Sequence, residues 1–284
     1  MRKPIKTSDE VGYHDFIPNQ IENLTSSDFE QRVIEPKILL FDIETAANEG
    51  KFWSRPWQTS IIKITQHTHM IAWSAKWLGG KQVTKALPDY EGYVPGSRDD
   101  KALVTELWGL LEQADMIVGH NSDKFDIPYT TGRAVINGLL PLKKLPSYDT
   151  KKVAKRNFGY TSNKLDDIAK LLGLGTKIPI HYEVWDRCEK GDAQAWKLMK
   201  KYNARDTKLL EQVYLKFRAW DQSHVNMNLL LNRSFEGCPA CGGKDTRSRG
   251  YNYTKTGRRP DLECMNPECG RRFSGKHEHI TNFR

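Results

Sequence analysis

The chain has 284 residues, with 44 Lys and Arg against 35 Asp and Glu, and a formal net charge of +9. This composition and a mean hydropathy of −0.66 are typical of a globular, water-soluble chain and exclude collagen-like and wholly disordered proteins. Apolar runs all fall short of the roughly 18 residues that a transmembrane helix needs. The positive excess favours a polyanionic partner, either nucleic acid or an anionic membrane surface, because clustered Lys and Arg displace counterions from phosphates.

The two ends of the chain differ in composition from its middle. Residues 1–36 are rich in Asn, Ser, Thr and charge without a sustained period, so we expect an N-terminal arm there. The first residues are basic but lack the apolar core and cleavage site of a secretory signal, which predicts a cytoplasmic protein. Four of the five cysteines fall in the last 47 residues. An odd, clustered number in a cytoplasmic chain favours a metal site over disulfides.

Strand and helix patterns alternate from Lys37 to about residue 233 and predict a single α/β domain there. Gly79-Gly80 predicts a hairpin between two of the strands, and Asp99 or Asp100 is a suitable N-cap for the first helix. Strands are expected at 37–41, 69–77, 81–85 and 115–118, and helices at 99–114, 125–138, 151–156, 165–172 and 192–218.

The first candidate catalytic motif is Phe41-Asp42-Ile43-Glu44-Thr45, at the end of the first expected strand. Side chains alternate along a strand, so Asp42 and Glu44 would project from one face. Two carboxylates held so close repel each other unless cations neutralise them. Taken alone, such a pair is more often a strand end with two solvated acids.

Two later segments carry further carboxylates. Residues 119–126 lie between a strand and a helix, where Asp126 would serve as a plain helix cap and Asp123 is a competing carboxylate. In the long expected helix, Tyr202 and Asp206 have the i, i+4 spacing that puts both on one face. Taken alone, Tyr202 would be a half-buried packing residue.

Together, D-x-E at 42–44, N-x-x-x-F-D at 121–126 and Y-x-x-x-D at 202–206 resemble the three exonuclease motifs of the DnaQ-like superfamily. The tyrosine (DEDDy) branch is favoured, because Lys201 stands where the other branch has a His. The similarity extends over about 37–220, and the stretches between the motifs are similar to stand-alone exonuclease-like proteins of phages and prophages, which are related to the proofreading domain of family B DNA polymerases. It implies an RNase H-like α/β fold, with a mixed sheet flanked by helices.

The resemblance also implies roles for these residues. Asp42, Glu44, Asp126 and Asp206 would hold two Mg²⁺ or Mn²⁺ ions. Ligands that are all oxygen atoms suit these hard cations, so zinc is not expected in this site. Tyr202 would orient the attacking water, and Glu44 would also bond the terminal 3′-hydroxyl. We therefore expect a two-metal-ion-dependent 3′–5′ exonuclease.

Three functions stay open at this point. Single-stranded or frayed DNA 3′ ends are favoured as substrate, because the tyrosine branch resembles polymerase proofreading domains; a replication or recombination protein is a candidate partner. A 3′–5′ exoribonuclease is the alternative, since no residue identifies a contact with a 2′-hydroxyl. A non-catalytic nucleic-acid-binding or recruitment module belongs to another class. The four carboxylates argue against it, because converging like charges cost free energy that bound metal would offset.

The cysteines Cys238-Pro-Ala-Cys241 and Cys264-Met-Asn-Pro-Glu-Cys269, separated by 22 residues, predict a zinc ribbon over 234–284. Each short loop lets two thiolates reach one tetrahedral Zn²⁺. The second loop has four intervening residues instead of two, which leaves its geometry open, and His277 or His279 is an alternative ligand. A module this small needs such a staple to fold.

Basic and aromatic residues interleave between the two cysteine pairs. Strict alternation from Arg247 to Lys255 would place these side chains on one face of a strand, where phosphates and bases could bind. The candidate nucleic-acid-binding residues are Arg247, Arg249, Tyr251, Tyr253, Lys255, Arg258 and Arg259. The alternative is a structural ribbon that packs on the nuclease domain or on a partner.

Other conspicuous side chains have plainer interpretations. Asp149 is expected to cap the helix at 151–156 or to support the site. Structural or supporting roles are expected for His120 and His181, and a buried thiol for Cys188. Trp53, Trp57 and Arg55 would either form a stacking wedge beside the first motif or pack in the core.

Overall fold

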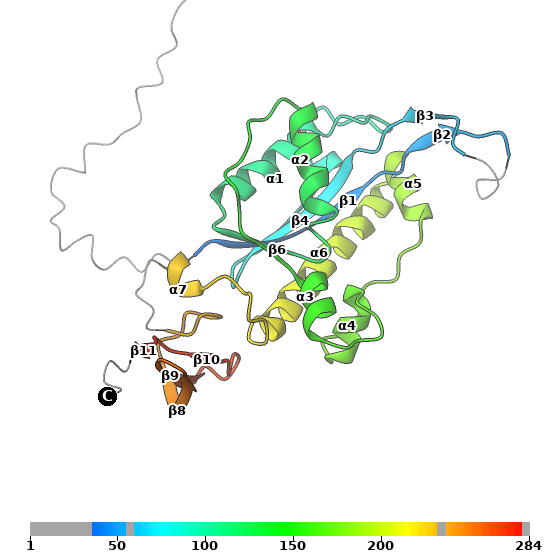
Figure 1. Ribbon diagram of the computed structural model, residues 1–284. Helices are drawn as coiled ribbons and strands as arrows, with labels where there is room; N and C mark the ends of the chain where they lie inside the picture. Colours follow the sequence, from blue (N-terminus) through cyan, green and yellow to red (C-terminus); the bar gives the residue numbers. More distant parts are fainter. Residues whose placement is uncertain (1–35, 55–59, 232–236, 280–284) are drawn as a thin grey trace, which may run out of the picture. The chain divides into compact units, whose positions relative to one another are not determined.

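The computed structural model describes residues 36–54, 60–231 and 237–279. The strands of its central sheet are β1 (Ile38–Thr45), β4 (Met70–Trp77), β5 (Gln82–Ala86), β6 (Met116–Gly119) and β7 (Ser147–Asp149). They lie in the order β5-β4-β1-β6-β7 (Figure 1). β4 runs antiparallel to both β1 and β5, whereas β1, β6 and β7 are parallel. The predicted mixed sheet is therefore confirmed.

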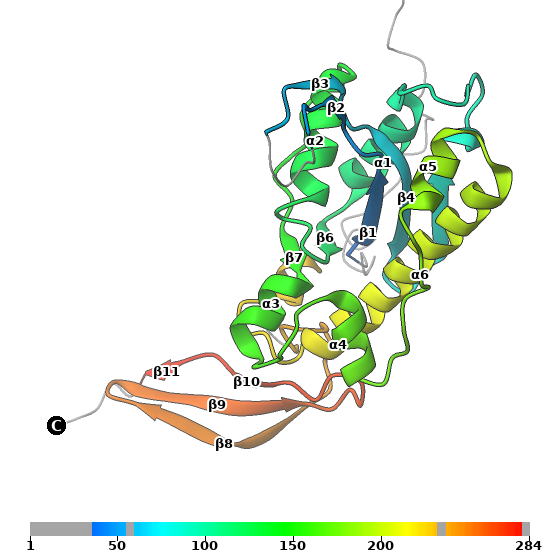
Figure 2. The same ribbon diagram turned by 90° about the vertical axis from the view of Figure 1, so that its right-hand side faces the viewer.

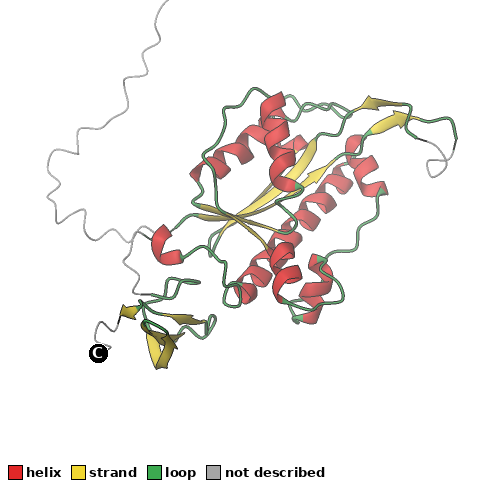
Figure 3. Ribbon diagram, in the orientation of Figure 1, coloured by secondary structure: helices red, strands yellow, loops and turns green. Residues whose placement is uncertain are grey.

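Helices cover both faces of this sheet. They are α1 (Lys101–Gln113), α2 (Asp126–Ile136), α3 (Thr150–Asn157), α4 (Leu165–Leu171), α5 (Glu183–Glu189), α6 (Ala193–Phe217) and α7 (Met227–Leu230), with a 3-10 turn at Leu87–Asp89. Figures 1 and 3 show α1 and α2 on one face, while the long α6 crosses the other and packs on β1, β4 and β5. This arrangement agrees with the RNase H-like fold. None of the described helices is long and apolar enough to cross a membrane.

β1 sends alternate side chains to the two faces of the sheet. Its odd-numbered residues over 39–43 pack in a buried cluster with α1. Ile38 and Leu40 pack in a second cluster with residues of α6. Asp42 and Glu44 continue this second series, so strand alternation directs both carboxylates toward α6.

Local chemistry sets the ends of the predicted elements. Asp192 begins α6, because its carboxylate accepts hydrogen bonds from the backbone N–H groups of Gln194 at 2.8 Å and Ala195 at 3.1 Å. Gly79 has φ +72° in the turn that joins β4 to β5, a conformation that favours glycine. The predicted hairpin and the start of the long helix are both confirmed.

Asp100 does not cap α1 with its side chain, as the sequence suggested it could. Its carboxylate is buried and accepts two hydrogen bonds from the Arg133 guanidinium, both at 2.7 Å. It also accepts bonds from the Met70 backbone N–H at 2.8 Å and the Asn137 amide at 3.0 Å. Asp99 accepts the bond from the Lys101 N–H instead. Asp100 therefore connects α1, α2 and β4.

A small two-stranded sheet was not predicted from the sequence. β2 (Glu49–Lys51) and β3 (Lys63–Gln66) form an antiparallel hairpin directly after the first motif. Trp53 follows β2 and is 87% exposed, so its side chain does not pack in the core. The proposed companions of Trp53 in a stacking wedge, at positions 55 and 57, lie outside the described residues.

The cysteine-containing segment forms a sheet of its own (Figure 2). Its strands are β8 (Thr246–Thr254), β9 (Gly257–Cys264), β10 (Arg272–Ser274) and β11 (Glu278–His279). β8, β10 and β11 each pair with β9 in antiparallel orientation. The buried Arg271 donates hydrogen bonds to the backbone carbonyls of Arg218 at 3.2 Å and Asp221 at 2.7 Å. These bonds satisfy carbonyl groups just beyond the end of α6.

Replacing Asp100 with Ala should lower the free energy of unfolding by about 3 to 5 kcal/mol, because the half-buried Arg133 loses its counter-ion. Urea denaturation with the far-UV circular dichroism signal measures the change. Glu112→Ala, an exposed acid of the same helix, is the matched control and should shift stability by less than about 0.5 kcal/mol. Equal losses in the two variants would contradict a structural role for the Asp100–Arg133 pair.

Candidate active site

β1 and α6 bring three carboxylates together. Asp42 and Glu44 lie near the end of β1, where a bulge after Glu44 interrupts the pairing with β4. Asp206 lies in the middle of α6. Carboxylate oxygens of the three residues lie within 4.8 Å of one another, and we call this group the carboxylate cluster. Three of the four predicted metal ligands therefore meet.

Asp126 lies beside the carboxylate cluster without being one of its three members. It is the first residue of α2, is 3% exposed, and accepts a hydrogen bond from the Ile43 backbone N–H at 3.1 Å. Its charge helps to raise the pKa of Asp42, so the two groups are electrostatically coupled. Phe125 holds the N-cap position of α2, and the plain capping role considered for Asp126 is therefore wrong.

Asp149 organises the loop that leads into α2. Its carboxylate accepts hydrogen bonds from the backbone N–H groups of Asn121 at 2.9 Å and Asp123 at 3.3 Å. It also accepts bonds from the N–H groups of Lys151 at 2.9 Å and Lys152 at 3.2 Å, as an N-cap of α3. Asn121 itself has φ +68°. The capping role predicted for Asp149 is confirmed, and the same carboxylate fixes the second motif.

The residues assigned structural roles lie outside the carboxylate cluster. His120 contacts the Thr150 hydroxyl through Nδ1 at 2.9 Å and the Asn163 carbonyl through Nε2 at 3.0 Å, so both ring nitrogens have partners. Cys188 is a buried free thiol on α5, as predicted. His181 is exposed and lies just before α5.

Two neighbouring side chains of α6 contact the carboxylate cluster. The Tyr202 side chain lies beside Asp206, one turn later on α6, and lowers the pKa of that carboxyl. The Asn203 amide donates to Asp42 Oδ2 at 2.7 Å and to the Asp42 carbonyl at 3.3 Å. Burial, followed by the charges of Asp206 and Glu44, raises the pKa of Tyr202, so the phenol stays neutral. Asn203 was not predicted, because the three motifs assign it no role.

Lys177 and Trp185 also reach the carboxylate cluster and were missed. The Lys177 ammonium lies 2.5 Å from Asp206 Oδ2 and 5.5 Å from the centroid of the Tyr202 ring. Burial lowers the pKa of Lys177, but the attraction to Asp206 outweighs it and the net shift is upward. Trp185 lowers the pKa of Glu44 and meets the Tyr202 ring edge-on, with the ring centroids 6.0 Å apart.

The carboxylates are strongly biased toward their protonated forms. Burial, then the charges of Asp126 and Glu44, raises the pKa of Asp42 well above its usual range. Burial and Asp206 raise the pKa of Glu44 to about 8. Burial also raises the pKa of Asp126 to about 7 and that of Asp206, which Lys177 opposes. Positive charge in addition to Lys177 would therefore stabilise the ionised cluster.

These side chains fit a hard divalent cation. Their donors are all carboxylate oxygens, which Mg²⁺ and Mn²⁺ prefer. Asp206 Oδ1 is buried and has no hydrogen-bond partner among the described residues. An unsatisfied buried carboxylate oxygen is costly, and a metal ion would supply the missing partner.

The family to which the chain is similar is a family of exonuclease domains. The family described as "DNA polymerase family B, exonuclease domain" matches residues 17–172, which is more than half of the chain. The chain belongs to this family. The matched residues include Asp42, Glu44 and Asp126, whereas α6 with Tyr202 and Asp206 lies beyond them. The match therefore supports the DnaQ-like exonuclease assignment from the first two motifs alone.

A solved structure with a similar chain is the family B DNA polymerase from the hyperthermophilic archaeon Pyrobaculum calidifontis, at 18% sequence identity and a TM-score of 0.44. The alignment covers 78% of this chain and 31% of the polymerase chain. The family member described here thus spans about a third of the polymerase's length. No curated protein sequence matches the chain.

The predicted cysteine ligands form a second cluster outside the region matched by the family. Sulfur atoms of Cys238, Cys241, Cys264 and Cys269 all lie within 4.8 Å of one another. All are free thiols, and burial raises the pKa of Cys264 to about 12. Four thiols packed this closely fit one thiolate-bound metal ion, whose charge would favour their deprotonation.

The longer second cysteine loop is closed by Asn266. Its side chain accepts a hydrogen bond from the Glu268 N–H at 2.9 Å, and its carbonyl accepts bonds from the Cys269 N–H at 2.9 Å and the Gly270 N–H at 3.0 Å. This turn brings Cys269 back to Cys238, with their sulfurs 3.8 Å apart. His277 and His279, the alternative ligands, are not part of the group and stack edge-on against each other.

β8 does not present its basic and aromatic residues on one face, as strict alternation predicted. Ser248 pairs with Leu262 and Tyr251 with Pro260, so Arg249 and Gly250 together oppose a single residue of β9. Gly250 has φ +120° at this bulge. The extra residue reverses the alternation, because a shift of one position moves every later side chain to the other face.

The bulge separates the candidate ligands into two groups. Arg247 and Arg249 both bond Glu263, at 2.9 and 2.6 Å. Tyr253 lies opposite Arg258, whose guanidinium lies 4.0 Å from the centroid of the Tyr251 ring. Lys255 lies in the turn after β8.

Millimolar Mg²⁺ or Mn²⁺ should raise the thermal stability of the protein, because ions bound by the ionised carboxylate cluster relieve its repulsion. At a metal concentration of about 100 Kd the gain is about 2.7 kcal/mol, measured by differential scanning calorimetry with and without EDTA. Asp42→Asn should lose this gain while its metal-free form is at least as stable as the wild type, since one like charge is removed. The exposed Glu91→Gln variant should respond as the wild type does, and an unchanged metal response in Asp42→Asn would remove Asp42 from the metal site.

The purified protein should contain one zinc ion per chain by elemental analysis, because four thiolates prefer a soft or borderline ion. Cys241→Ser should lose the metal and the folded ribbon, whereas Cys188→Ser should keep both. Loss of the β8–β9 amide signals in nuclear magnetic resonance spectra reports the unfolding. Equal zinc content in the two variants would contradict the proposed ligand set.

Proposed function

We propose that the chain is a metal-dependent 3′–5′ exonuclease that acts on single-stranded or frayed DNA 3′ ends. The carrying observation is the convergence of Asp42, Glu44 and Asp206, with an unsatisfied buried oxygen, in a chain of the exonuclease-domain family. Like charges brought together at such cost are typical of a metal-dependent site. The matching family is the exonuclease domain of family B DNA polymerases, and this favours DNA over RNA as the substrate.

In this proposal, two Mg²⁺ or Mn²⁺ ions held by Asp42, Glu44, Asp126 and Asp206 would supply Lewis-acid activation of the attacking water and stabilisation of the leaving 3′-oxygen. Tyr202 would orient the attacking water, because its neutral hydroxyl can donate one hydrogen bond and accept another. Asn203 holds the Asp42 carboxylate in place through its amide, which fixes one ligand before substrate arrives.

Lys177 and Trp185 support the charges of the same site. The Lys177 ammonium opposes the upward shift in the pKa of Asp206, and Trp185 lowers the pKa of Glu44. Both side chains therefore favour the ionised carboxylates that metal binding requires. Their contacts help to explain how several acids can lie so close together at the end of β1.

Asp42→Ala and Asp206→Ala should each reduce digestion by at least about a thousandfold, because each removes a metal ligand and the two act as one unit. The assay follows Mg²⁺-dependent shortening of matched 5′-labelled DNA and RNA oligonucleotides. We expect both oligonucleotides to be shortened from their 3′ ends, the DNA faster than the RNA. A 3′-phosphate should block this digestion. Asp123→Ala, which changes the competing carboxylate of the second motif, should retain most of the activity.

Three outcomes of this assay separate the candidate functions. Faster digestion of RNA would favour the exoribonuclease. Binding of both oligonucleotides without digestion by the wild type, in the presence of metal, would favour a non-catalytic module. Full activity in purified Asp42→Ala would contradict the proposed site itself.

We further propose that the ribbon, residues 234–284, is a zinc-stabilised domain that helps to hold the single strand. The positively charged side chains of the ribbon differ in whether they already form ion pairs with glutamates. Arg247 and Arg249 share Glu263, and Arg258 pairs with Glu278 at 2.7 Å. Ion pairs reduce the net charge that these arginines offer to phosphates.

Arg259 and Lys276 are the better candidates for phosphate contacts. Neither forms an ion pair with any residue in the part of the chain that the structure describes. Both line a groove of about 870 Å³ together with Phe273 and His277. Cations beside an aromatic ring are the combination that binds a single-stranded backbone with its bases.

Arg259→Ala/Lys276→Ala should weaken binding of a poly-dT oligonucleotide and lower the salt slope of log K by about 1.4, since each lost phosphate contact on a single strand removes about 0.7. Arg247→Ala/Arg249→Ala removes the same charge and should change the slope less, because those arginines already have Glu263 as counter-ion. Fluorescence anisotropy over a salt series measures both. Equal slopes in both double variants and the wild type would show that the ribbon does not grip the strand.

A further inference from the structure

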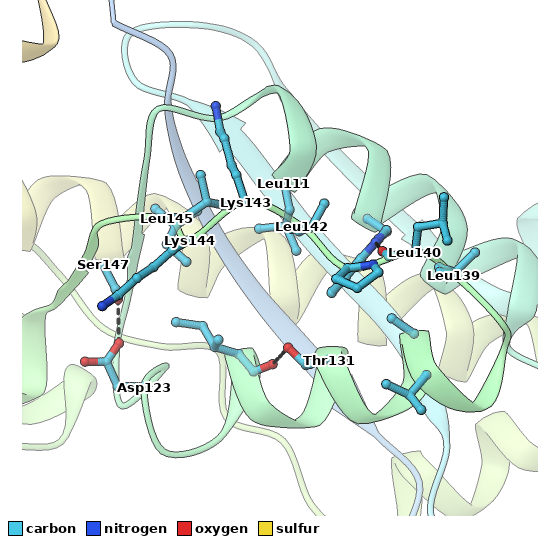
Figure 4. A pocket seen from close by; sticks show the side chains of 16 residues that line it. Leu111, Asp123, Thr131, Leu139, Leu140, Leu142, Lys143, Lys144, Leu145 and Ser147 are labelled. Atoms are coloured by element: carbon cyan, nitrogen blue, oxygen red, sulfur yellow. Dashed lines mark hydrogen bonds between the residues drawn. The ribbon is translucent and has the colours of Figure 1, made fainter.

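An apolar pocket of about 460 Å³ lies between α1, α2 and the segment over residues 139–145. Figure 4 shows side chains of that segment facing those of α1 and α2 across the pocket. Its walls are mainly aliphatic and include Leu111, Ile117, Ile127, Ala134, Leu142 and Leu145. This volume is in the range that accepts bulky apolar groups.

The apolar surface continues outward from the pocket. Val135 and Leu140 line it, yet they are 72% and 83% exposed. Ile136, next to Val135 on α2, is 69% exposed. Exposed aliphatic side chains that adjoin a pocket are typical of a surface that another group covers.

The polar side chains of the pocket already have partners. Trp108 Nε1 donates to the Leu140 carbonyl at 2.9 Å, and the Thr131 hydroxyl donates to the Ile127 carbonyl at 2.8 Å. The Ser147 hydroxyl donates to Asp123 Oδ1 at 2.5 Å. A small polar ligand would therefore find few convergent hydrogen-bonding groups here, which such ligands usually need for specificity.

The charges at the edge of the pocket are positive. Lys143 and Lys144 are exposed, and neither has an ion-pair partner within the described ranges. In Figure 4 both lie on the segment that carries the leucines, and the Lys143 side chain extends away from it. Asp123, the one acid among the lining residues, is paired with Lys152 at 2.6 Å. The edge therefore complements a ligand with negative charges.

We propose that this pocket docks a short acidic peptide segment of a partner protein, with a bulky aliphatic or aromatic side chain in the pocket and neighbouring carboxylates at Lys143 and Lys144. The apolar walls would supply most of the affinity, and the lysines would select the acidic sequence and speed association. None of the proposed metal ligands lines the pocket. The proposal therefore does not depend on the exonuclease activity.

A fluorescein-labelled peptide of four Asp followed by Leu-Phe, with a free carboxyl terminus, tests the proposal by anisotropy with the full chain. Saturable binding that weakens as salt rises is expected. Lys143→Glu/Lys144→Glu should weaken it about tenfold or more, whereas Lys208→Glu/Lys216→Glu, the same charge change on exposed lysines of α6, should leave it within about twofold. Val135→Ser/Leu140→Ser should also weaken it about tenfold; all of these positions are exposed, so the fold is retained.

Other occupants give different results. Absence of peptide binding would overturn the proposal, as would equal loss in both lysine pairs. Competition by a poly-dT oligonucleotide at the lysine pair would assign the surface to nucleic acid. Self-association that Val135→Ser/Leu140→Ser abolishes would assign it to a second copy of the chain. If the surface binds the peptide as proposed, the digestion of DNA by Lys143→Glu/Lys144→Glu should be unchanged, which keeps this test separate from that of the exonuclease.

Discussion

Mutual repulsion among the closely spaced carboxylates of β1, α2 and α6 is the constraint on which the rest of the site depends. Each of the four acids has its pKa raised, with burial as the largest cause. Each of the unpredicted side chains at the site lowers the free-energy cost of ionising these acids. Lys177 contributes a positive charge, Asn203 donates a hydrogen bond to Asp42, and Trp185 lowers the pKa of Glu44. A site whose acids only supported the fold would gain nothing from bringing them together.

The fold can carry this cost because the strand that bears the first motif is held on both sides. β1 pairs with β4 along most of its length and with β6 at its start, and the Ile43 N–H bonds to Asp126. Asp149 in turn fixes the loop before α2. Asp42, Glu44 and Asp126 are therefore on segments that these bonds fix relative to one another.

Features with a short-range signal could be predicted from the sequence, and features made by distant pairs could not. Strand alternation and the i, i+4 spacing placed Asp42, Glu44 and Asp206 on the faces that meet. Lys177 lies in an irregular segment without a period, so only the folded chain shows that it reaches Asp206. Asp100 was expected to cap α1 because capping is local, whereas its actual partner, Arg133, is 33 residues away. The β8 bulge was missed because one residue with φ +120° reverses a regular alternation.

The positive excess of the chain indicates a partner only after internal pairing is taken into account. Arg247, Arg249 and Arg258 carry the obvious basic pattern of the ribbon, yet glutamates on the same sheet neutralise them. The cations with no counter-ion among the described residues include Arg259 and Lys276, which line the groove of the ribbon. An arginine that already forms an ion pair with a glutamate gains little from a phosphate, because it must first break the existing ion pair. For the strand binding proposed for the ribbon, the unpaired cations, rather than the most basic stretch of sequence, are therefore where a polyanion would gain free energy.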